Sequence, residues 1–211
     1  KLINRFKAYR QIHFPQNADE FNEAVNRIKF EELFLSQLRM NMLRSHRHRF
    51  SKGVVFEKVG DLFNTFYEKH LPFQLTGAQK RVVKEIRNDT AKGKQMNRLL
   101  QGDVGSGKTI VAVLCMLLAA DNGCQSCLMA PTEILAQQHF KTISELLGKM
   151  DVPVQILTGS TKANENKKIL QQLIDGQLQI LIGTHAVIEE VVKFKNLGIV
   201  IIDEQHRFGV A

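Results

Sequence analysis

The sequence has no apolar run of membrane-spanning length, and no secretory pattern follows Lys1. We therefore expect no membrane partner and a cytoplasmic location. Internal repeats and low-complexity tracts are also absent, so nothing in the sequence favours a repeat protein.

Cysteine is scarce, with only Cys115, Cys124 and Cys127 in the chain. Three cysteines cannot all pair, so a disulfide framework is not expected and a reducing compartment is favoured. Cys124 and Cys127 form a C-x-x-C pair, but no two further ligands follow at the spacing of a zinc site. Because Cys127 lies in the apolar stretch 126–130, we interpret it as a small buried hydrophobic residue.

Length and charge set the class of protein. The chain has 211 residues, of which 44% are hydrophobic, which is enough for one α/β domain with a sizeable core and an appendage. Lys and Arg number 29 against 21 Asp and Glu, and the net charge of +8 favours a polyanionic partner, above all nucleic acid. The chain starts without Met and stops after an acidic motif, so we expect a piece of a longer protein.

The most informative motif is a glycine-rich loop that follows the apolar pair Leu99-Leu100. Its glycines let several backbone N–H groups face one anion, and the helix expected after it adds the positive end of its dipole. Lys108 supplies a charge for the β- and γ-phosphates, and the Thr109 hydroxyl can bind Mg²⁺. The loop therefore predicts a nucleotide phosphate site formed by Gly102, Asp103, Val104, Gly105, Ser106, Gly107, Lys108 and Thr109.

An acidic pair lies about a hundred residues further on, after the apolar stretch 197–202. A strand without polar side chains is expected at the centre of a parallel sheet covered on both faces, and such sheets bind ligands at their carboxyl edge. We assign Asp203 to Mg²⁺ and Glu204 to the attacking water. Together with Lys108, these carboxylates predict hydrolysis of a nucleoside triphosphate.

Residues 1–72 are interpreted as a helical linker. A long helix is predicted over 18–49 and a second over 59–70, with Pro72 ending it. Asp19 can cap the first helix, whose length suggests that it braces a neighbouring domain. Its basic end, 44–49, either complements the helix dipole or contacts nucleic-acid phosphates. The apolar stripe of this helix comprises Phe21, Val25, Ile28, Leu35, Leu38 and Met42.

Residues 73–211 alternate between strands and helices, which predicts a mainly parallel sheet with right-handed crossovers and helices on both faces. The predicted strands are 97–101, 126–130, 153–157, 179–183 and 197–203. The predicted helices are 76–92, 107–121, 132–148, 163–175 and 184–192.

Small polar residues follow three of the predicted strands, in the motifs 130–138, 158–160 and 183–185. Such residues beside helix N-termini bind phosphates, and each can also be a simple helix cap. Because all three motifs share one edge, we favour a track for a nucleic-acid backbone.

Four motifs taken in order resemble the first motor domain of superfamily-two helicases. They read Gly-Asp-Val-Gly-Ser-Gly-Lys-Thr, Ala-Pro-Thr-Glu-Ile-Leu-Ala, Ile-Gly-Thr-His-Ala and Asp-Glu-Gln-His-Arg-Phe-Gly-Val (203–210). Within that superfamily they look like the RecG family of bacterial ATP-dependent DNA helicases, and the segment His13-Phe14-Pro15 with the long helix is similar to the linker of that family. The resemblance implies a RecA-like P-loop NTPase fold, fork reversal and Holliday junction branch migration in DNA repair and recombination.

Two alternatives stay open. The transcription-repair coupling factor has similar motifs, but the third residue of its acidic motif is usually Glu, where this chain has Gln205, and it lacks the pair Thr132-Glu133. A non-catalytic, nucleotide-responsive DNA-binding module is the other alternative.

The resemblance also implies roles for residues. It implies ATP and Mg²⁺ as cofactors, with Gln79 in the adenine-specifying motif and Phe73 packing nearby. It also implies that Gln205 and His206 couple the state of the γ-phosphate to the partner domain. It implies three partners: branched or duplex DNA, a second RecA-like domain with arginine fingers, and a wedge domain. It also implies a bacterial, nucleoid-associated protein. The 211 residues alone are expected to bind ATP without unwinding DNA. The residues that it assigns to the DNA path are Pro131, Thr132, Thr158, Gly159, Thr184 and His185.

Overall fold

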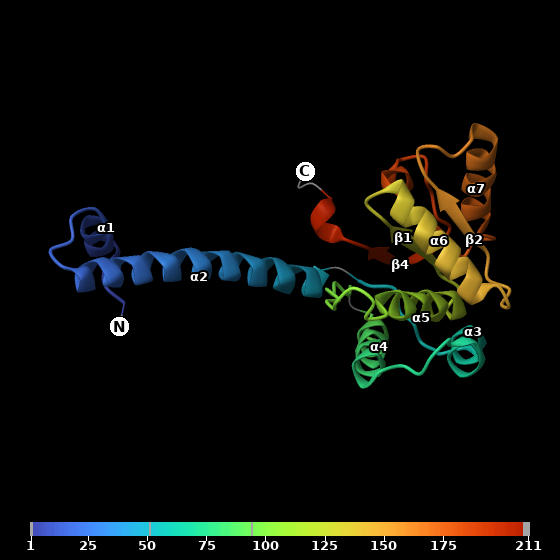
Figure 1. Cartoon of the computed structure of the whole chain (residues 1–211), viewed down its shortest axis with the longest axis horizontal. Helices are drawn as coiled ribbons and strands as arrows, with labels where there is room; N and C mark the ends of the chain where they lie inside the picture. The colour runs from blue at the N-terminus through green and yellow to red at the C-terminus, as the bar shows by residue number, and fades with distance from the viewer. Residues whose placement is uncertain (1, 51, 94, 209–211) are drawn as a thin grey trace. The chain divides into compact units, whose positions relative to one another are not determined.

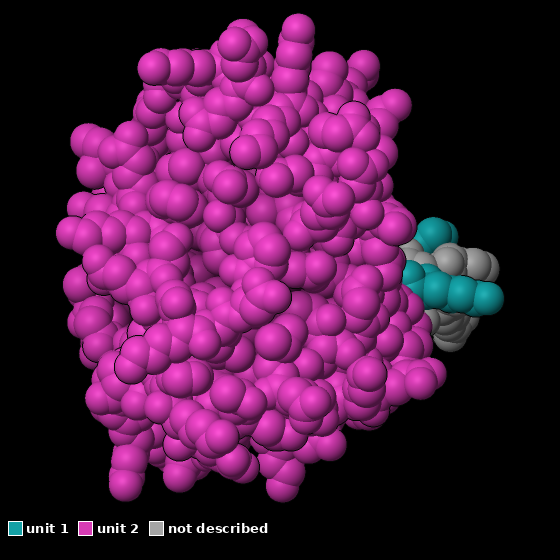
Figure 2. All heavy atoms as spheres, turned by 90° about the vertical axis from the view of Figure 1, so that its right-hand side faces the viewer, with its two compact units in different colours: residues 1–52 teal, residues 53–211 magenta. Residues whose placement is uncertain are grey.

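The structure of the chain is a computed structural model that describes residues 2–50, 52–93 and 95–208, with only the backbone described for 47–50. The chain divides into two compact units, Lys1–Lys52 and Gly53–Ala211, which Figure 2 colours separately. Within the described residues, no helix combines the length and the apolar character that a bilayer crossing requires.

The first unit is a pair of helices, α1 (Arg5–His13) and α2 (Ala18–Phe50). The helices approach closely at Ala8 and Ala24, which are both buried because a methyl side chain leaves room for the facing backbone. The predicted helix over 18–49 is confirmed to within one residue. Its predicted cap is wrong, however: the side chain of Asn17, and not Asp19, accepts the backbone N–H of Glu20 at 2.9 Å.

Most of the predicted apolar stripe of α2 is exposed within this unit. Leu35 and Met42 are 54% and 65% exposed, whereas Val25 and Ile28 are partly buried. The side chains of Arg47, His48 and Arg49 lie outside the described part of the chain, so both interpretations of the basic end remain predictions.

The second unit begins with an extended segment and the helix α3 (Asp61–Thr65), which continues as the π-helical turn η1 (Phe66–His70). Phe66 is fully buried in the main core of this unit. Residues 53–72 therefore pack with the α/β unit, whereas the sequence had suggested a division between residues 72 and 73.

Four longer helices follow: α4 (Gly77–Thr90), α5 (Lys108–Asp121), α6 (Glu133–Leu147) and α7 (Ala163–Asp175). Each was predicted within about two residues of its observed ends, because each has a capping or glycine signal and an apolar period. The predicted helix 184–192 is wrong, since only a single 3-10 turn, η2 (His185–Ile188), forms there.

The strands form one parallel sheet (Figure 1), with the order β2-β3-β1-β4. Side chains alternate between its two faces. Leu128 packs against α5 and α6 on one face, and Cys127 packs against α7 on the other. The strands are β1 (Gln125–Met129), β2 (Val154–Leu157), β3 (Ile180–Gly183) and β4 (Leu197–Ile202).

Two expectations about the sheet are wrong. Residues 97–101 do not form a strand, because among the described residues no neighbouring strand offers them a ladder of hydrogen bonds. Leu100 still packs beside Val111, whereas Leu99 is 69% exposed. Accordingly β4 is an edge strand of the described sheet and not its centre, and Val200 is half exposed.

All three cysteines are free and buried, which confirms the burial predicted for Cys127. Burial raises the pKa of both Cys115 and Cys127 to about 12, because the apolar surroundings disfavour the charged thiolate. Among the described residues, no group of three or more His, Cys, Asp or Glu side chains lies close enough together to hold a metal ion.

Candidate nucleotide and nucleic-acid site

The glycine-rich loop turns sharply into α5. Gly105 and Gly107 have φ angles of 80° and 76°, a left-handed conformation that a residue with a Cβ adopts only at a cost. Gly107 is also the N-cap of α5 and has no side chain to satisfy the first N–H groups of that helix. These N–H groups therefore remain available to an anion.

Lys108, the first residue of α5, folds back over this loop. Its Nζ donates to the carbonyl oxygens of Gly102 at 2.7 Å and Asp103 at 2.9 Å. The ammonium group thus lies over the mouth of the loop, where the charge of a phosphate would compete with two neutral carbonyls. Val104 at the tip is fully exposed and contributes no packing to the core.

Gln79 lies in the first turn of α4 and is almost fully buried. Its Oε1 accepts the backbone N–H of Thr76 at 2.9 Å, and Thr76 in turn caps the helix. Its Nε2 donates to the carbonyl of Ser106 at 2.9 Å. The side chain that was assigned to adenine therefore also joins the start of α4 to the phosphate loop, and one of its N–H bonds is left for a ligand.

The acidic pair follows β4 directly. The backbone N–H of Asp203 donates to the carbonyl of Met129 at 2.9 Å, which extends the ladder between β1 and β4 by one residue. The Asp203 side chain lies 2.8 Å from Nε2 of His139 on α6, a contact that the sequence analysis did not anticipate. Glu204 has φ 49° and is the only described residue other than glycine with a positive φ.

Topology brings the loop and the acidic pair to one edge of the sheet. The last residue of α5, Asp121, lies four residues before β1 begins, so the C-terminal end of α5 lies at the amino edge of the strands. Since α5 packs along β1 and β4, its first residue, Lys108, lies toward the carboxyl edge, where Asp203 follows β4.

The positive φ of Glu204 is a strained backbone conformation for a residue with a Cβ. Such strain is typical of residues that are held in place for a function.

The donors at this edge fit a magnesium ion. The Thr109 hydroxyl and the Asp203 carboxylate are hard oxygen donors, the type that Mg²⁺ prefers. Among the described residues, only one carboxylate oxygen of Asp203 has a hydrogen-bond partner, and the other is left for a cation or its water shell. His206 lies 3.4 Å from the carboxylate of Glu204 and is mostly exposed.

The residues predicted to form a nucleic-acid path all lie at this same carboxyl edge. Each pair follows one strand, and the three strands are neighbours in the sheet. Thr158 is buried, whereas Thr132 and Gly159 are exposed; Thr132 also caps α6 by accepting the N–H of Leu135. The pairs are Pro131 and Thr132 after β1, Thr158 and Gly159 after β2, and Thr184 and His185 after β3.

The carboxylate of Glu133, to which the sequence assigned no role at the site, joins two of these pairs. The side chain of Glu133 accepts hydrogen bonds from the hydroxyl of Thr158, at 3.0 Å, and from the hydroxyl of Ser160. The sequence pointed to Glu133 only through its place in the motif 130–138 and through the pair Thr132-Glu133, and neither predicted this contact. Glu133 therefore holds the turn after β2 against the start of α6.

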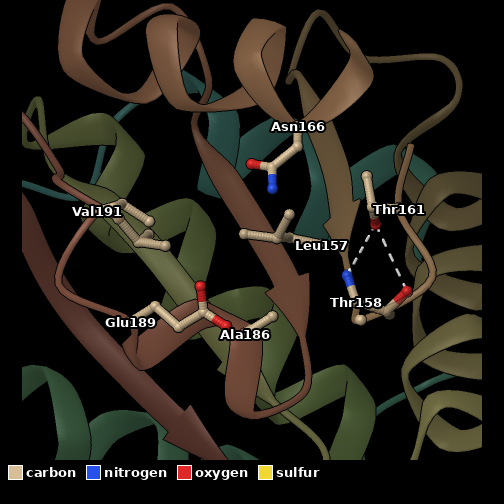
Figure 3. Close-up of a pocket in the computed structure, with 9 residues that line it drawn as sticks. Leu157, Thr158, Thr161, Asn166, Ala186, Glu189 and Val191 are labelled. Atoms are coloured by element: carbon tan, nitrogen blue, oxygen red, sulfur yellow. Dashed lines mark hydrogen bonds between the residues drawn. The ribbon is translucent and has the colours of Figure 1, made fainter. Parts of the chain in front are cut away.

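A small hollow of about 110 Å³ lies beside this turn (Figure 3). Asn166 of α7 points into it, and the Asn166 Oδ1 atom is buried without a hydrogen-bond partner among the described residues. The backbone N–H of Thr158 donates to Oγ1 of Thr161 at 2.9 Å, which closes the turn at the rim of the hollow. Glu189 lines the opposite side.

His185 is exposed after β3, and its ring lies edge-on to Phe208, with centroids 5.3 Å apart. This contact joins the turn after β3 to the segment that follows the acidic motif. Residues 209 and 210, which end that motif, lie outside the described residues.

The chain is similar in sequence and in structure to known DNA helicases. The chain is 47% identical over its full length to the ATP-dependent DNA helicase RecG of Synechocystis sp. and 48% identical to that of Thermotoga maritima, of which it spans 25% and 27%. A solved structure of RecG bound to a three-way DNA junction matches 97% of the chain with a TM-score of 0.83 and 46% identity, over 28% of that protein.

These relatives confirm the predicted resemblance to RecG and the RecA-like α/β fold. The chain spans about a quarter to a third of the length of the curated relatives that it matches. A family model described as DEAD/DEAH box helicase matches residues 76–211, the part that carries the phosphate loop and the acidic pair. The chain therefore belongs to the DEAD/DEAH box helicase family.

Proposed function

We propose that this chain is the first motor unit of an ATP-dependent DNA helicase that acts on branched DNA in repair and recombination. The observation that carries the proposal is that the glycine-rich loop and the pair Asp203-Glu204 lie at the same edge of the sheet. The similarity to RecG proteins over the whole chain supports the choice of DNA as the substrate.

In this proposal Gly102–Thr109 binds the phosphates of ATP. Lys108 exchanges its two carbonyl partners for the β- and γ-phosphates, and the free N–H groups of α5 stabilise the same charge. Glu204 orients and polarises the attacking water and accepts its proton. Gln79 recognises the adenine with its remaining N–H bond, and His206 senses the γ-phosphate.

Thr109 and Asp203 would hold Mg²⁺ at this site, where the ion neutralises charge on the transferred phosphoryl group. The protein supplies the arrangement of hard oxygen donors, and Asp203 is anchored for that task through its backbone bond to Met129.

The turns after β1, β2 and β3 form the proposed DNA path. Exposed hydroxyl and N–H groups at strand ends bind phosphates of a nucleic-acid backbone, and the net charge of +8 agrees with an anionic partner. Glu133 keeps two of these turns in register.

The complete enzyme would contain further parts. We propose a second RecA-like domain that supplies arginine fingers and a wedge domain that engages the DNA branch. Residues 1–52, the part of the predicted linker 1–72 that forms a unit of its own, would be the linker that braces them. Because an arginine finger accelerates hydrolysis by a factor on the order of 10³–10⁵, residues 1–211 alone would hydrolyse ATP slowly at best. We also propose that they bind ATP weakly and do not unwind DNA. We place the protein in the bacterial cytoplasm, on the nucleoid.

The substitution Glu204→Gln in the full-length protein tests this function. It removes the proposed base and keeps the size of the side chain, so hydrolysis of ATP should fall at least about a hundredfold while ATP binding persists. Forks, four-way junctions and single strands should be compared as activators, with branched DNA expected to stimulate most. Unchanged turnover in the Gln variant would refute the assignment of Glu204.

A further inference from the structure

His139 is placed where it can control the proposed metal ligand. It lies in the middle of α6, and its Nε2 atom is 2.8 Å from Oδ2 of Asp203. The His139 side chain is 17% exposed and that of Asp203 is 30% exposed, so water competes little for this bond. The two residues are 64 positions apart, and only the packing of α6 on the sheet brings them together.

The chemistry of the two groups sets the direction of the bond. An ionised carboxylate only accepts hydrogen bonds. The Nε2 atom of His139 therefore carries the hydrogen and donates a hydrogen bond to Oδ2 of Asp203. Among the described residues no other group bonds to the Asp203 side chain. The second oxygen, Oδ1, is therefore free, and its direction is determined by the bond to His139.

The backbone of Asp203 is already held by the bond from its N–H to Met129. Rotation about its two side-chain torsions is then the main freedom that the carboxylate keeps, and a single hydrogen bond to one oxygen removes most of it. Carboxylates that bind metals are commonly hydrogen-bonded in this way, and loss of such an outer partner typically weakens metal binding about 10–100-fold.

We propose that His139 is a positioning residue that orients the Asp203 carboxylate toward the divalent cation of the bound nucleotide. The inference rests on the proposed function, since it assumes that Asp203 binds that cation. His139 itself touches neither the cation nor the nucleotide, and it acts through the N–H that it donates to Asp203.

Two substitutions separate positioning from packing. His139→Leu introduces an apolar side chain of similar size and removes the donor, whereas His139→Gln keeps an N–H donor on a side chain of similar reach. Lys141→Gln, an exposed change on the same helix, serves as the matched control. All variants are made in the full-length protein.

The measurement is Mn²⁺ binding, followed by electron paramagnetic resonance in the presence of β,γ-imido-ATP. We expect His139→Leu to weaken Mn²⁺ binding about tenfold, and His139→Gln to stay within about threefold of the wild type. Affinity for the nucleotide in EDTA, without any metal, should be the same in all variants.

Four outcomes decide the inference. Wild-type Mn²⁺ affinity in His139→Leu overturns it, and so does an equal loss in the Leu and Gln variants accompanied by an equal drop in melting temperature, which indicates packing alone. If the wild-type protein itself binds no Mn²⁺ with the nucleotide, the proposed function fails first. A loss in the Leu variant that the Gln variant restores supports the positioning role.

Discussion

Gln79 donates its side-chain N–H to the carbonyl oxygen of Ser106 at 2.9 Å. The same amide accepts the backbone N–H of Thr76 and completes the cap of α4. One buried side chain therefore joins the start of a helix to the loop proposed to bind phosphate.

The variants Gln79→Glu and Gln79→Leu should separate these two roles. Glu keeps the acceptor of the capping box but sets a nearly buried carboxylate against the carbonyl oxygen of Ser106, so ATP binding should weaken about tenfold and stability should fall as well. Leu removes both bonds, including the one that completes the cap of α4. The free energy of unfolding, measured by urea denaturation, should therefore fall by about 1 kcal/mol. Equal ATP affinity in wild type and Gln79→Glu would contradict the proposed link to the loop.

Replacing Lys108 by Ala should abolish ATP hydrolysis and weaken nucleotide binding at least about tenfold, because the loop loses its only side-chain cation. Titration with a fluorescent ADP derivative measures the affinity. Lys141→Ala, an exposed change on α6, controls for the loss of charge and should leave binding unchanged. A Lys108→Ala protein that still hydrolyses ATP at the wild-type rate would refute the phosphate site.

Asp121→Ala should destabilise the second unit. The Asp121 carboxylate accepts three backbone N–H groups, those of Gly60, Leu62 and Phe63, each at 3.0 Å, and thereby satisfies the start of α3. Removing this acceptor should lower the free energy of unfolding by about 2–3 kcal/mol. Urea denaturation measures the change, and Asp121→Asn, which keeps one acceptor oxygen, should lose less than Ala does.

Thr158→Val should impair the response to DNA and spare basal hydrolysis. Val matches the shape of Thr but cannot donate to Glu133, so the turn after β2 keeps only the bond from Ser160 to α6. In the full-length protein we expect DNA-stimulated ATP turnover to fall about threefold to tenfold, with DNA-free turnover unchanged. Thr142→Val, an exposed change on α6, is the control. Equal DNA stimulation in both variants would argue against this turn as part of the DNA path.

The buried thiols should make the protein sensitive to alkali. The pKa of Cys115 and Cys127 is about 12 in the folded protein against an ordinary 9.0, so above pH 9 the unfolded chain loses protons that the folded chain retains. The contribution of the two buried thiols to the free energy of unfolding is therefore fully present below pH 9. It falls as the pH rises toward 12, by up to about 1.4 kcal/mol per pH unit for each thiol.

Comparison with the double variant Cys115→Ala/Cys127→Ala isolates this effect from other groups that titrate in the same range. Urea denaturation at pH 8, 9 and 10 should give a shallower fall of stability in the double variant. Parallel curves would mean that the thiols do not contribute. The native thiols should also resist alkylation by iodoacetamide at pH 8, because the thiolate is the reactive form.

The sequence by itself determined the features that depend on residues close to one another along the chain. The phosphate loop, the α2 helix and four of the five predicted strands follow from glycine positions, capping residues and apolar periods within a few residues of each other. Parallel strands then place every strand-end motif at one edge, so the candidate site could be assembled without coordinates.

Only the tertiary structure decided which residues meet across the chain. The bonds from His139 to Asp203 and from Thr158 to Glu133 join residues 64 and 25 positions apart, and no local pattern encodes them. Residues 97–101 have the apolar side chains of a strand but no neighbour to pair with among the described residues. A strand is completed by hydrogen bonds from another segment, so its formation depends on packing that a local sequence does not contain.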